Sequence, residues 1–293
     1  MLSVNHELVE ANGVRLHVAR SGVGRPLVLL HGWPEYWETW LPLMERLSKD
    51  FTLIAPDFRG FGDSEKPDGE MPSAAAGTDV LAQDIAVLME KLGVGEFGIV
   101  AHDISAFTAQ HLSRSMPKQI SGAFYFDCPY PGMGIGRPPN PNLVKEAWYQ
   151  GFAQLPWAAK MVGSSRENCA DYLGHFLRHW SQNPSWVDEV LEHWVDNLMI
   201  PGNLQGGFNW YVSQARAAVA GGQPHPIAKI TVPTCVRWGD CAVLPSAFAD
   251  RLGDVFVNLD AAEFLGAGHF PHRETPDLAA SEIAKFFDRV WAI

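Results

Sequence analysis

The chain contains 293 residues, of which 47% are hydrophobic and 19% are charged, and this composition excludes an intrinsically disordered protein. Asp and Glu number 33 against 22 Lys and Arg, so the formal net charge is −11. Such an acidic chain is not expected to bind nucleic acid or an anionic membrane through its overall charge. Neither a targeting segment nor an apolar run of about 18 residues is visible, so the sequence predicts a soluble, cytoplasmic protein.

Apolar runs bounded by turn residues predict most of the strands. The first 25 residues alternate in polarity and turn at residues 12–13, which predicts two short antiparallel strands. Strands buried on both faces are expected at residues 26–30, 51–56, 97–101, 121–126, 233–238 and 255–259. Helical spacing of apolar residues predicts helices at 36–47, 78–92, 246–252 and 277–290, and a further helix that ends near residue 115.

The alternation of strands and helices is interrupted between residues 129 and 226, where helix-like segments rich in tryptophan replace it. This order predicts an α/β protein whose mostly parallel sheet has helices on both faces. A core domain is expected at 1–128 and 227–293, and a helical cap domain at 129–226, inserted after the sixth strand. Ligands should bind beyond the carboxyl ends of the strands, beneath the cap.

A possible nucleophile lies between a predicted strand and a helix, in the segment Ala101-His102-Asp103-Ile104-Ser105. Small residues on either side permit the tight, strained turn that projects the central side chain in a nucleophile elbow. A serine usually occupies this place, whereas an aspartate is already charged at neutral pH and needs no base for its first attack. The alternative is that Asp103 only caps the following helix.

Two further motifs lie at predicted strand ends. In His31-Gly32-Trp33-Pro34, a glycine before a bulky residue can turn a backbone N–H toward a ligand, or can simply form a turn. In Gly266-Ala267-Gly268-His269-Phe270, the histidine follows the last strand and can reach the same sheet edge, or can lie on the surface. The order of aspartate, insertion and histidine matches that of nucleophile and histidine in α/β-hydrolases.

With these motifs the chain resembles the α/β-hydrolase superfamily over nearly its whole length, and the segment 57–64, D-F-R-G-F-G-D-S, resembles a loop of that fold. An aspartate as nucleophile resembles epoxide hydrolases and haloalkane or haloacid dehalogenases. The resemblance implies an ester on Asp103 that is hydrolysed by water activated by His269. The backbone N–H groups of Trp33 and Ile104 are expected to form the oxyanion hole.

The acid that orients the histidine is where this sequence departs from many relatives, which carry it in a W-G-x-x-D pattern. Here Trp238-Gly239-Asp240-Cys241 is followed by Ala242, so the expected position holds no acid. Asp127, directly after the sixth strand, matches the position that some dehalogenases and a minority of epoxide hydrolases use. We therefore expect Asp127 rather than Asp240 to orient His269, although Asp127 could also be only a turn residue.

Two tyrosines in the expected cap resemble the pair with which epoxide hydrolases protonate the epoxide oxygen. Tyr149 occurs in the context W-Y-Q-G-F and Tyr211 in the context F-N-W-Y. A phenol can donate a hydrogen bond and deliver a proton to an alkoxide. Aromatic packing within the cap is the alternative. The neighbouring Trp148, Phe152 and Trp210 are expected to line an apolar substrate pocket.

The sequence therefore predicts an epoxide hydrolase that takes a small apolar epoxide and needs no cofactor or metal. A dehalogenase that uses the same nucleophile is the alternative enzyme, but Ile104 and Phe107 stand where fluoroacetate dehalogenases carry arginines. A non-catalytic ligand-binding member of the fold is the alternative of another class. The oligomeric state stays open, and a homodimer is possible.

Overall fold

The computed structural model describes residues 2–69, 71–74, 76–133, 145–220, 227–240 and 246–292. Its framework is an eight-stranded sheet with the strand order β1-β2-β4-β3-β5-β6-β7-β8. β2 is antiparallel to β1 and β4, and the other pairs are parallel. The strands are β1 Asn5–Ala11, β2 Val14–Ser21, β3 Arg25–Leu30, β4 Phe51–Pro56, β5 Phe97–His102, β6 Ile120–Phe126, β7 Thr234–Gly239 and β8 Leu259–Phe264.

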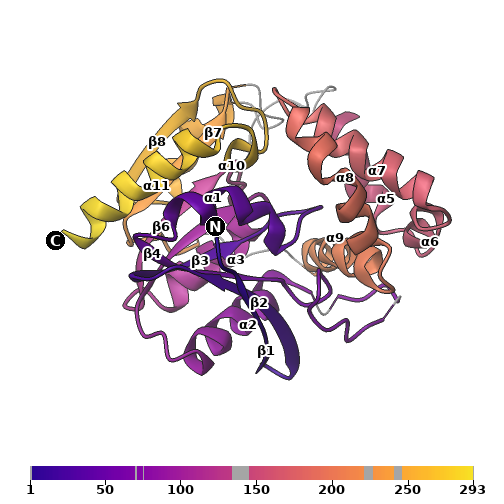
Figure 1. Ribbon diagram of the computed structural model, residues 1–293, viewed down its shortest axis with the longest axis horizontal. Coiled ribbons are helices and arrows are strands. Elements are labelled where there is room, and N and C mark those ends of the chain that lie inside the picture. Colours follow the sequence, from indigo (N-terminus) through magenta and orange to yellow (C-terminus); the bar gives the residue numbers. More distant parts are fainter. Residues whose placement is uncertain are drawn as a thin grey trace.

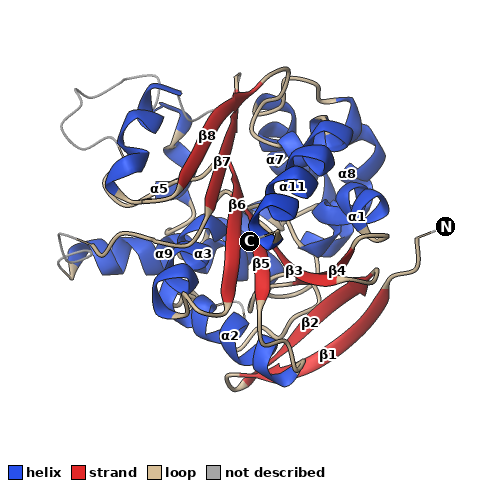
Figure 2. Ribbon diagram, turned by 90° about the vertical axis from the view of Figure 1, so that its left-hand side faces the viewer, coloured by secondary structure: helices blue, strands red, loops and turns tan. Residues whose placement is uncertain are grey.

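Helices cover both faces of this sheet, as the sequence predicts. α1 and α11 pack together on one face, and α2 and α3 pack together on the other (Figure 2). The continuous apolar runs are explained by this double cover, since β5 is buried at every position. These helices and the short ones beside them are η1 Trp37–Trp40, α1 Leu41–Leu47, α2 Thr78–Lys91, α3 Ser105–Ser115, η2 Ser246–Asp254, α10 Pro271–Glu274 and α11 Pro276–Trp291.

Five described helices lie between β6 and β7, where the sequence predicts the insertion. Figure 1 shows them in pink to orange, grouped beside the sheet. Residues 134–144 and 221–226 of the expected cap lie outside the described residues. The helices are α5 Trp148–Phe152, α6 Ala158–Val162, α7 Arg166–His179, α8 Ser185–Leu198 and α9 Asn203–Val219.

A glycine pair lets α9 approach the core closely. A Cβ added at Gly206 would lie 1.9 Å from the carbonyl oxygen of Gly60, in the loop after β4. Only glycine permits so close an approach of two backbones. This contact holds α9, which carries Tyr211, against the sheet's carboxyl edge.

Two element predictions are wrong in detail. The helix expected at 36–47 is divided into η1 and α1. The last strand begins at Leu259, where the predicted strand ends. Val255 and Phe256 are buried ahead of it, and Phe256 forms only an isolated bridge to Ile230. β8 is an edge strand with exposed residues, so its sequence lacks a continuous apolar run. Among the described helices, none combines the length and the apolar character that crossing a membrane requires.

Candidate active site

Asp103 occupies the sharp turn between β5 and α3, where the sequence places a nucleophile. Its φ angle is +50°, a conformation that is rare and strained for a residue other than glycine. The Ser105 hydroxyl supports the turn by accepting a hydrogen bond from the backbone N–H of His102 at 3.0 Å. A Cβ added at Gly32 would lie 2.7 Å from the Cβ of Asp103, so only glycine leaves room for the projecting carboxylate.

The two oxygens of the Asp103 carboxylate have different surroundings. Oδ2 accepts a hydrogen bond from the backbone N–H of Trp33 at 3.1 Å, which is one of the two predicted oxyanion donors. Oδ1 lies 3.8 Å from Nε2 of His269, which is too far for a hydrogen bond. Ile104, the second predicted donor, follows the turn and lines a cavity together with Asp103 and His269. The Nε2 atom of His269 is therefore not committed to the carboxylate.

Asp127 is the carboxylate that holds His269. It directly follows β6 with a φ angle of +44°, and its Oδ2 lies 2.6 Å from Nδ1 of His269. Its Oδ1 accepts a hydrogen bond from the backbone N–H of Gly239 at 3.2 Å. Because a carboxylate accepts, His269 carries a proton on Nδ1 and leaves Nε2 available as a base.

Asp240 has a different role in the structure. Its Oδ1 accepts a hydrogen bond from the backbone N–H of Gly266 at 2.9 Å, within the loop that carries the histidine. The expected contact of Asp127 rather than Asp240 with His269 is thus present. Position 242, where the W-G-x-x-D pattern has its acid, lies outside the described residues.

A buried charge network behind the histidine was not predicted from the sequence. His102 Nδ1 lies 2.7 Å from Oε2 of Glu35, and its Nε2 lies 2.7 Å from the backbone oxygen of His269. Both partners accept hydrogen bonds, so both ring nitrogens must donate and the ring must be an imidazolium. Burial lowers the pKa of His102, but the Glu35 carboxylate outweighs burial and raises that pKa to about 9.

His272 completes this network. Its Nε2 lies 2.9 Å from Oε1 of Glu35, and burial lowers the pKa of His272 to about 4, so that this ring is neutral. The side chains of Glu35, His102 and His272 are fully buried and could in number hold a metal ion. The ring nitrogens of the two histidines are already hydrogen-bonded to the Glu35 carboxylate. We therefore interpret the cluster as a hydrogen-bond network rather than a metal site. In the sequence, each of these three residues lies within or just after one of the three motifs at the strand ends, and this position was the only local signal of the network.

Tyr149 of α5 and Tyr211 of α9 converge on the same cavity as Asp103 and His269. Their rings lie 5.5 Å apart at an angle of 87°, and Tyr149 also stacks on Trp33 at 5.1 Å. Burial, with the negative charge of Asp103, raises the pKa of Tyr149 above its usual value, and burial with Tyr149 and Asp103 raises the pKa of Tyr211 well above its usual value. Both phenols are therefore protonated donors.

The cavity between the strand ends and the inserted helices has a volume of about 540 Å³, which is typical of small-molecule sites. Trp210 lines it as predicted. Trp180 also lines it, although sequence reasoning gave that residue no role. The backbone oxygen of Trp180 accepts a hydrogen bond from the backbone N–H of His269 at 2.7 Å. Its lining combines the reactive groups with apolar side chains such as Ile104 and Phe107 and with the polar Gln150 and Gln214.

Trp148 and Phe152 were expected in this pocket, and the structure corrects both assignments. Trp148 is 46% exposed and packs on Phe176, while Phe152 packs against Tyr172. Neither residue is among those that line the cavity. Trp148 directly precedes Tyr149, and consecutive side chains of an α-helix point about 100° apart. Phe152 instead packs among aromatic rings of the inserted helices, since it contacts Phe208 as well as Tyr172.

Similarities to known proteins extend over nearly the whole chain. A family model described as alpha/beta hydrolase fold matches residues 25–185. The soluble epoxide hydrolase of Corynebacterium sp. (strain C12) is 29% identical, with 97% of each protein covered. The AB hydrolase superfamily protein YfhM of Bacillus subtilis (strain 168) is 30% identical over 82% of each. The solved structure titled epoxide hydrolase CorEH without ligand has a TM-score of 0.84 and 25% identity, covering 98% of this chain and 100% of that one.

Proposed function

The chain belongs to the α/β-hydrolase superfamily, in its epoxide hydrolase branch, and from this we propose that it converts an apolar epoxide to a vicinal diol through an ester on Asp103. Residues 1–128 and 227–293 would form the catalytic core, and residues 129–226 the cap that carries the two tyrosines. The single observation that supports this function best is the position of two protonated phenols, Tyr211 buried and Tyr149 partly buried, in one cavity with the carboxylate.

In the first step, Oδ1 of Asp103 attacks an epoxide carbon. A carbon–oxygen bond forms to the carboxylate as the ring carbon–oxygen bond breaks, and the ring oxygen takes a proton from Tyr149 or Tyr211. A donor placed at a developing oxyanion commonly contributes about 3 kcal/mol to lowering the barrier. Because Oδ1 is the oxygen without the Trp33 hydrogen bond, it is the better placed nucleophile.

In the second step, His269 Nε2 removes a proton from water, and the hydroxide adds to the ester carbon of Asp103. Negative charge then develops on Oδ2, where the Trp33 N–H already donates, with Ile104 N–H proposed as the second donor. Asp127 stabilises the imidazolium. The tetrahedral intermediate then collapses and expels the alkoxide of the product. The hydroxyl proton of the new carboxyl group passes to this alkoxide, which completes the diol. The proton on His269 then restores the hydroxyl of the tyrosine that was deprotonated in the first step.

Two measurements test this function. Turnover of styrene oxide should exceed that of a chlorinated alkane, and a non-catalytic ligand-binding protein would turn over neither. In a single turnover in heavy-oxygen water, the label should enter the Asp103 carboxylate while the first diol carries unlabelled oxygen. Label that enters the diol at once would contradict the ester intermediate, and turnover of the chlorinated alkane alone would favour a dehalogenase.

A further inference from the structure

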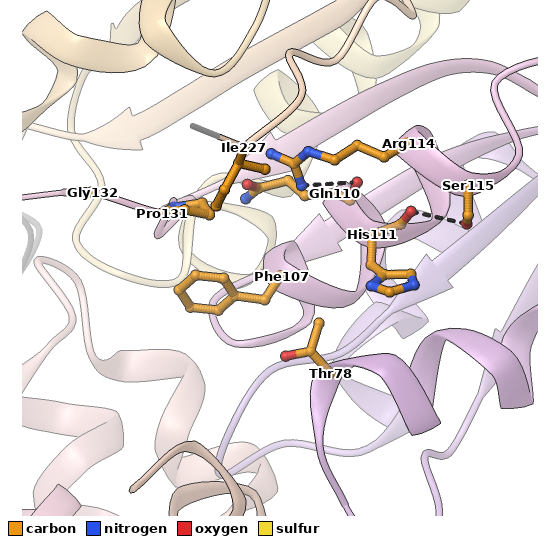
Figure 3. A pocket seen from close by; sticks show the side chains of 9 residues that line it. All are labelled: Thr78, Phe107, Gln110, His111, Arg114, Ser115, Pro131, Gly132 and Ile227. Carbon is orange, nitrogen blue, oxygen red and sulfur yellow. Dashed lines mark hydrogen bonds between the residues drawn. The ribbon is translucent and has the colours of Figure 1, made fainter. Parts of the chain in front are cut away.

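The nucleophile and the histidine of the proposed reaction are held in place in different ways. Asp103 stands just ahead of α3, an 11-residue helix that is supported by hydrogen bonds within itself. Figure 3 shows one of them, from the Ser115 hydroxyl to the backbone oxygen of His111 at 3.0 Å. His269 lies instead in the loop between β8 and α10, residues 265–270, which we call the histidine loop. A loop has no regular ladder of backbone hydrogen bonds of its own, so other segments must hold it in place.

The histidine loop lies directly against the turn between α7 and α8, residues 180–184, which we call the α7–α8 turn. The backbone N–H of His269 donates to the backbone oxygen of Trp180 at 2.7 Å. A Cβ added at Gly268 would lie 2.2 Å from the same oxygen, so the two backbones touch and only glycine fits between them. The position of His269 therefore depends on the position of this turn.

Glu274, the last residue of α10, joins these two segments through its carboxylate. Its Oε1 accepts hydrogen bonds from the backbone N–H groups on either side of the histidine, those of Gly268 at 2.9 Å and Phe270 at 3.1 Å. Its Oε2 accepts two more from the α7–α8 turn, those of Gln182 at 2.7 Å and Asn183 at 2.9 Å. Four backbone donors from two separate segments thus share one side chain.

A local cap for the short helix α10 is the simpler role for this carboxylate, but it explains only half of the contacts. The bonds of Oε1 are local, because Phe270 lies four residues before Glu274. The bonds of Oε2 reach residues that are 91 and 92 positions away in the chain. Hydrogen bonds to an ionised acceptor are roughly twice as strong as those between neutral groups. The negative charge of Glu274 therefore matters to how firmly the loop and the turn are joined.

The backbone that Glu274 holds directs the ring of His269. On one side of the ring, Nδ1 lies 2.6 Å from Oδ2 of Asp127. On the other side, Nε2 lies 3.8 Å from Oδ1 of Asp103, where the proposed reaction needs a base for water. Glu274 itself is not among the residues that line the reaction cavity. Any effect of Glu274 on the reaction must therefore pass through the position of His269.

We propose that Glu274 is a positioning residue for ester hydrolysis. By joining the histidine loop to the α7–α8 turn, it keeps Nε2 of His269 within reach of the water that attacks the ester on Asp103. Misplacement of a reacting group by about 1 Å can slow a step about 100-fold. The inference rests on the role of His269 in the proposed function.

Glu274→Gln tests this role with little change in the shape of the side chain. The single amide oxygen can accept from only one of the two segments, and the NH₂ group then faces the N–H donors of the other. In rapid mixing with styrene oxide and mass spectrometry of the intact protein, ester formation on Asp103 should keep its rate, because that step does not use His269. Ester hydrolysis should slow by about 10- to 100-fold. Because ester accumulates, kcat and KM should fall together, whereas a smaller fraction of folded protein would lower kcat alone.

Asp277→Asn is the matched control, because it removes the same charge three residues farther along the chain. The Asp277 side chain is 89% exposed and pairs with Arg46 of α1 at 2.6 Å. Both rate constants should remain unchanged in this variant. Glu274→Asp keeps the charge but is one methylene shorter, so that it should slow ester hydrolysis less than Glu274→Gln does. This variant decides the matter if Glu274→Gln fails to fold.

A measurement without substrate separates this inference from the proposed function. The proton between His269 Nδ1 and Asp127 should give a downfield proton resonance in the unaltered protein, and this resonance should shift in Glu274→Gln but not in Asp277→Asn. Equal slowing of both steps, unchanged ester hydrolysis in the Glu274 variants, or an unchanged resonance would overturn the positioning role. If the unaltered protein formed no ester with any epoxide, the proposed function would fail instead, and the resonance would still test the position of His269.

Discussion

The substitution Asp127→Asn tests the assignment of the histidine's partner most directly. Asp127 is completely buried and its Oδ2 lies 2.6 Å from Nδ1 of His269. An asparagine keeps the shape and retains an oxygen for the Gly239 N–H, but presents an NH₂ group to the ring or forces a different arrangement of the amide. With NH₂ facing Nδ1, the ring must carry its proton on Nε2, where it can no longer accept one from water.

The expected loss is large and confined to the second step. Replacing the acid in a comparable triad lowers the rate about 10⁴-fold, which corresponds to about 5.4 kcal/mol. Ester formation on Asp103 does not use His269, so rapid mixing with excess styrene oxide, followed by mass spectrometry of the intact protein, should show an accumulated adduct. Ester hydrolysis should be slower than in the unaltered protein by about three to four orders of magnitude.

Asp240→Asn is the matched control for this experiment. Asp240 accepts one hydrogen bond from the Gly266 N–H, and an amide oxygen can accept it equally well. Its rate should therefore exceed that of Asp127→Asn by at least about tenfold, or about 1.4 kcal/mol. Equal losses in the two variants, or near-normal ester hydrolysis by Asp127→Asn, would refute the assignment of Asp127.

Three further predictions concern the remaining groups of the site. His269→Gln should form the covalent adduct and then stall, and a variant that binds substrate without any adduct would contradict its role in the second step. The double variant Tyr149→Phe and Tyr211→Phe should lose epoxide opening but spare any halide displacement, measured as chloride release, because halide leaves without a proton; near-normal epoxide turnover would exclude the phenols as proton donors. Glu35→Gln should change the pH dependence of stability: since Glu35 raises the pKa of His102 to about 9, the free energy of unfolding should fall between about pH 6.5 and 9 in the unaltered protein. Denaturant titrations should show a smaller fall over that range in the variant, and an equal fall would contradict the buried charge pair.

Local sequence patterns were sufficient for the architecture and for the reactive turns. Buried parallel strands have continuous apolar runs, so β3 to β7 could be predicted from hydrophobicity alone. The turn at Asp103 is formed by consecutive residues, and small neighbours are a requirement of its own backbone geometry. The last strand was predicted at the wrong residues, because edge strand β8 has exposed positions and therefore lacks a continuous apolar run.

The sequence by itself determined which residue types stand at the ends of the strands, and therefore the chemical class of the site. The tertiary structure decided which of them meet: Asp127 and His269 are 142 positions apart, and His272 and Glu35 are 237 apart. Such pairings depend on the strand order and on the direction of each side chain, which no local pattern encodes.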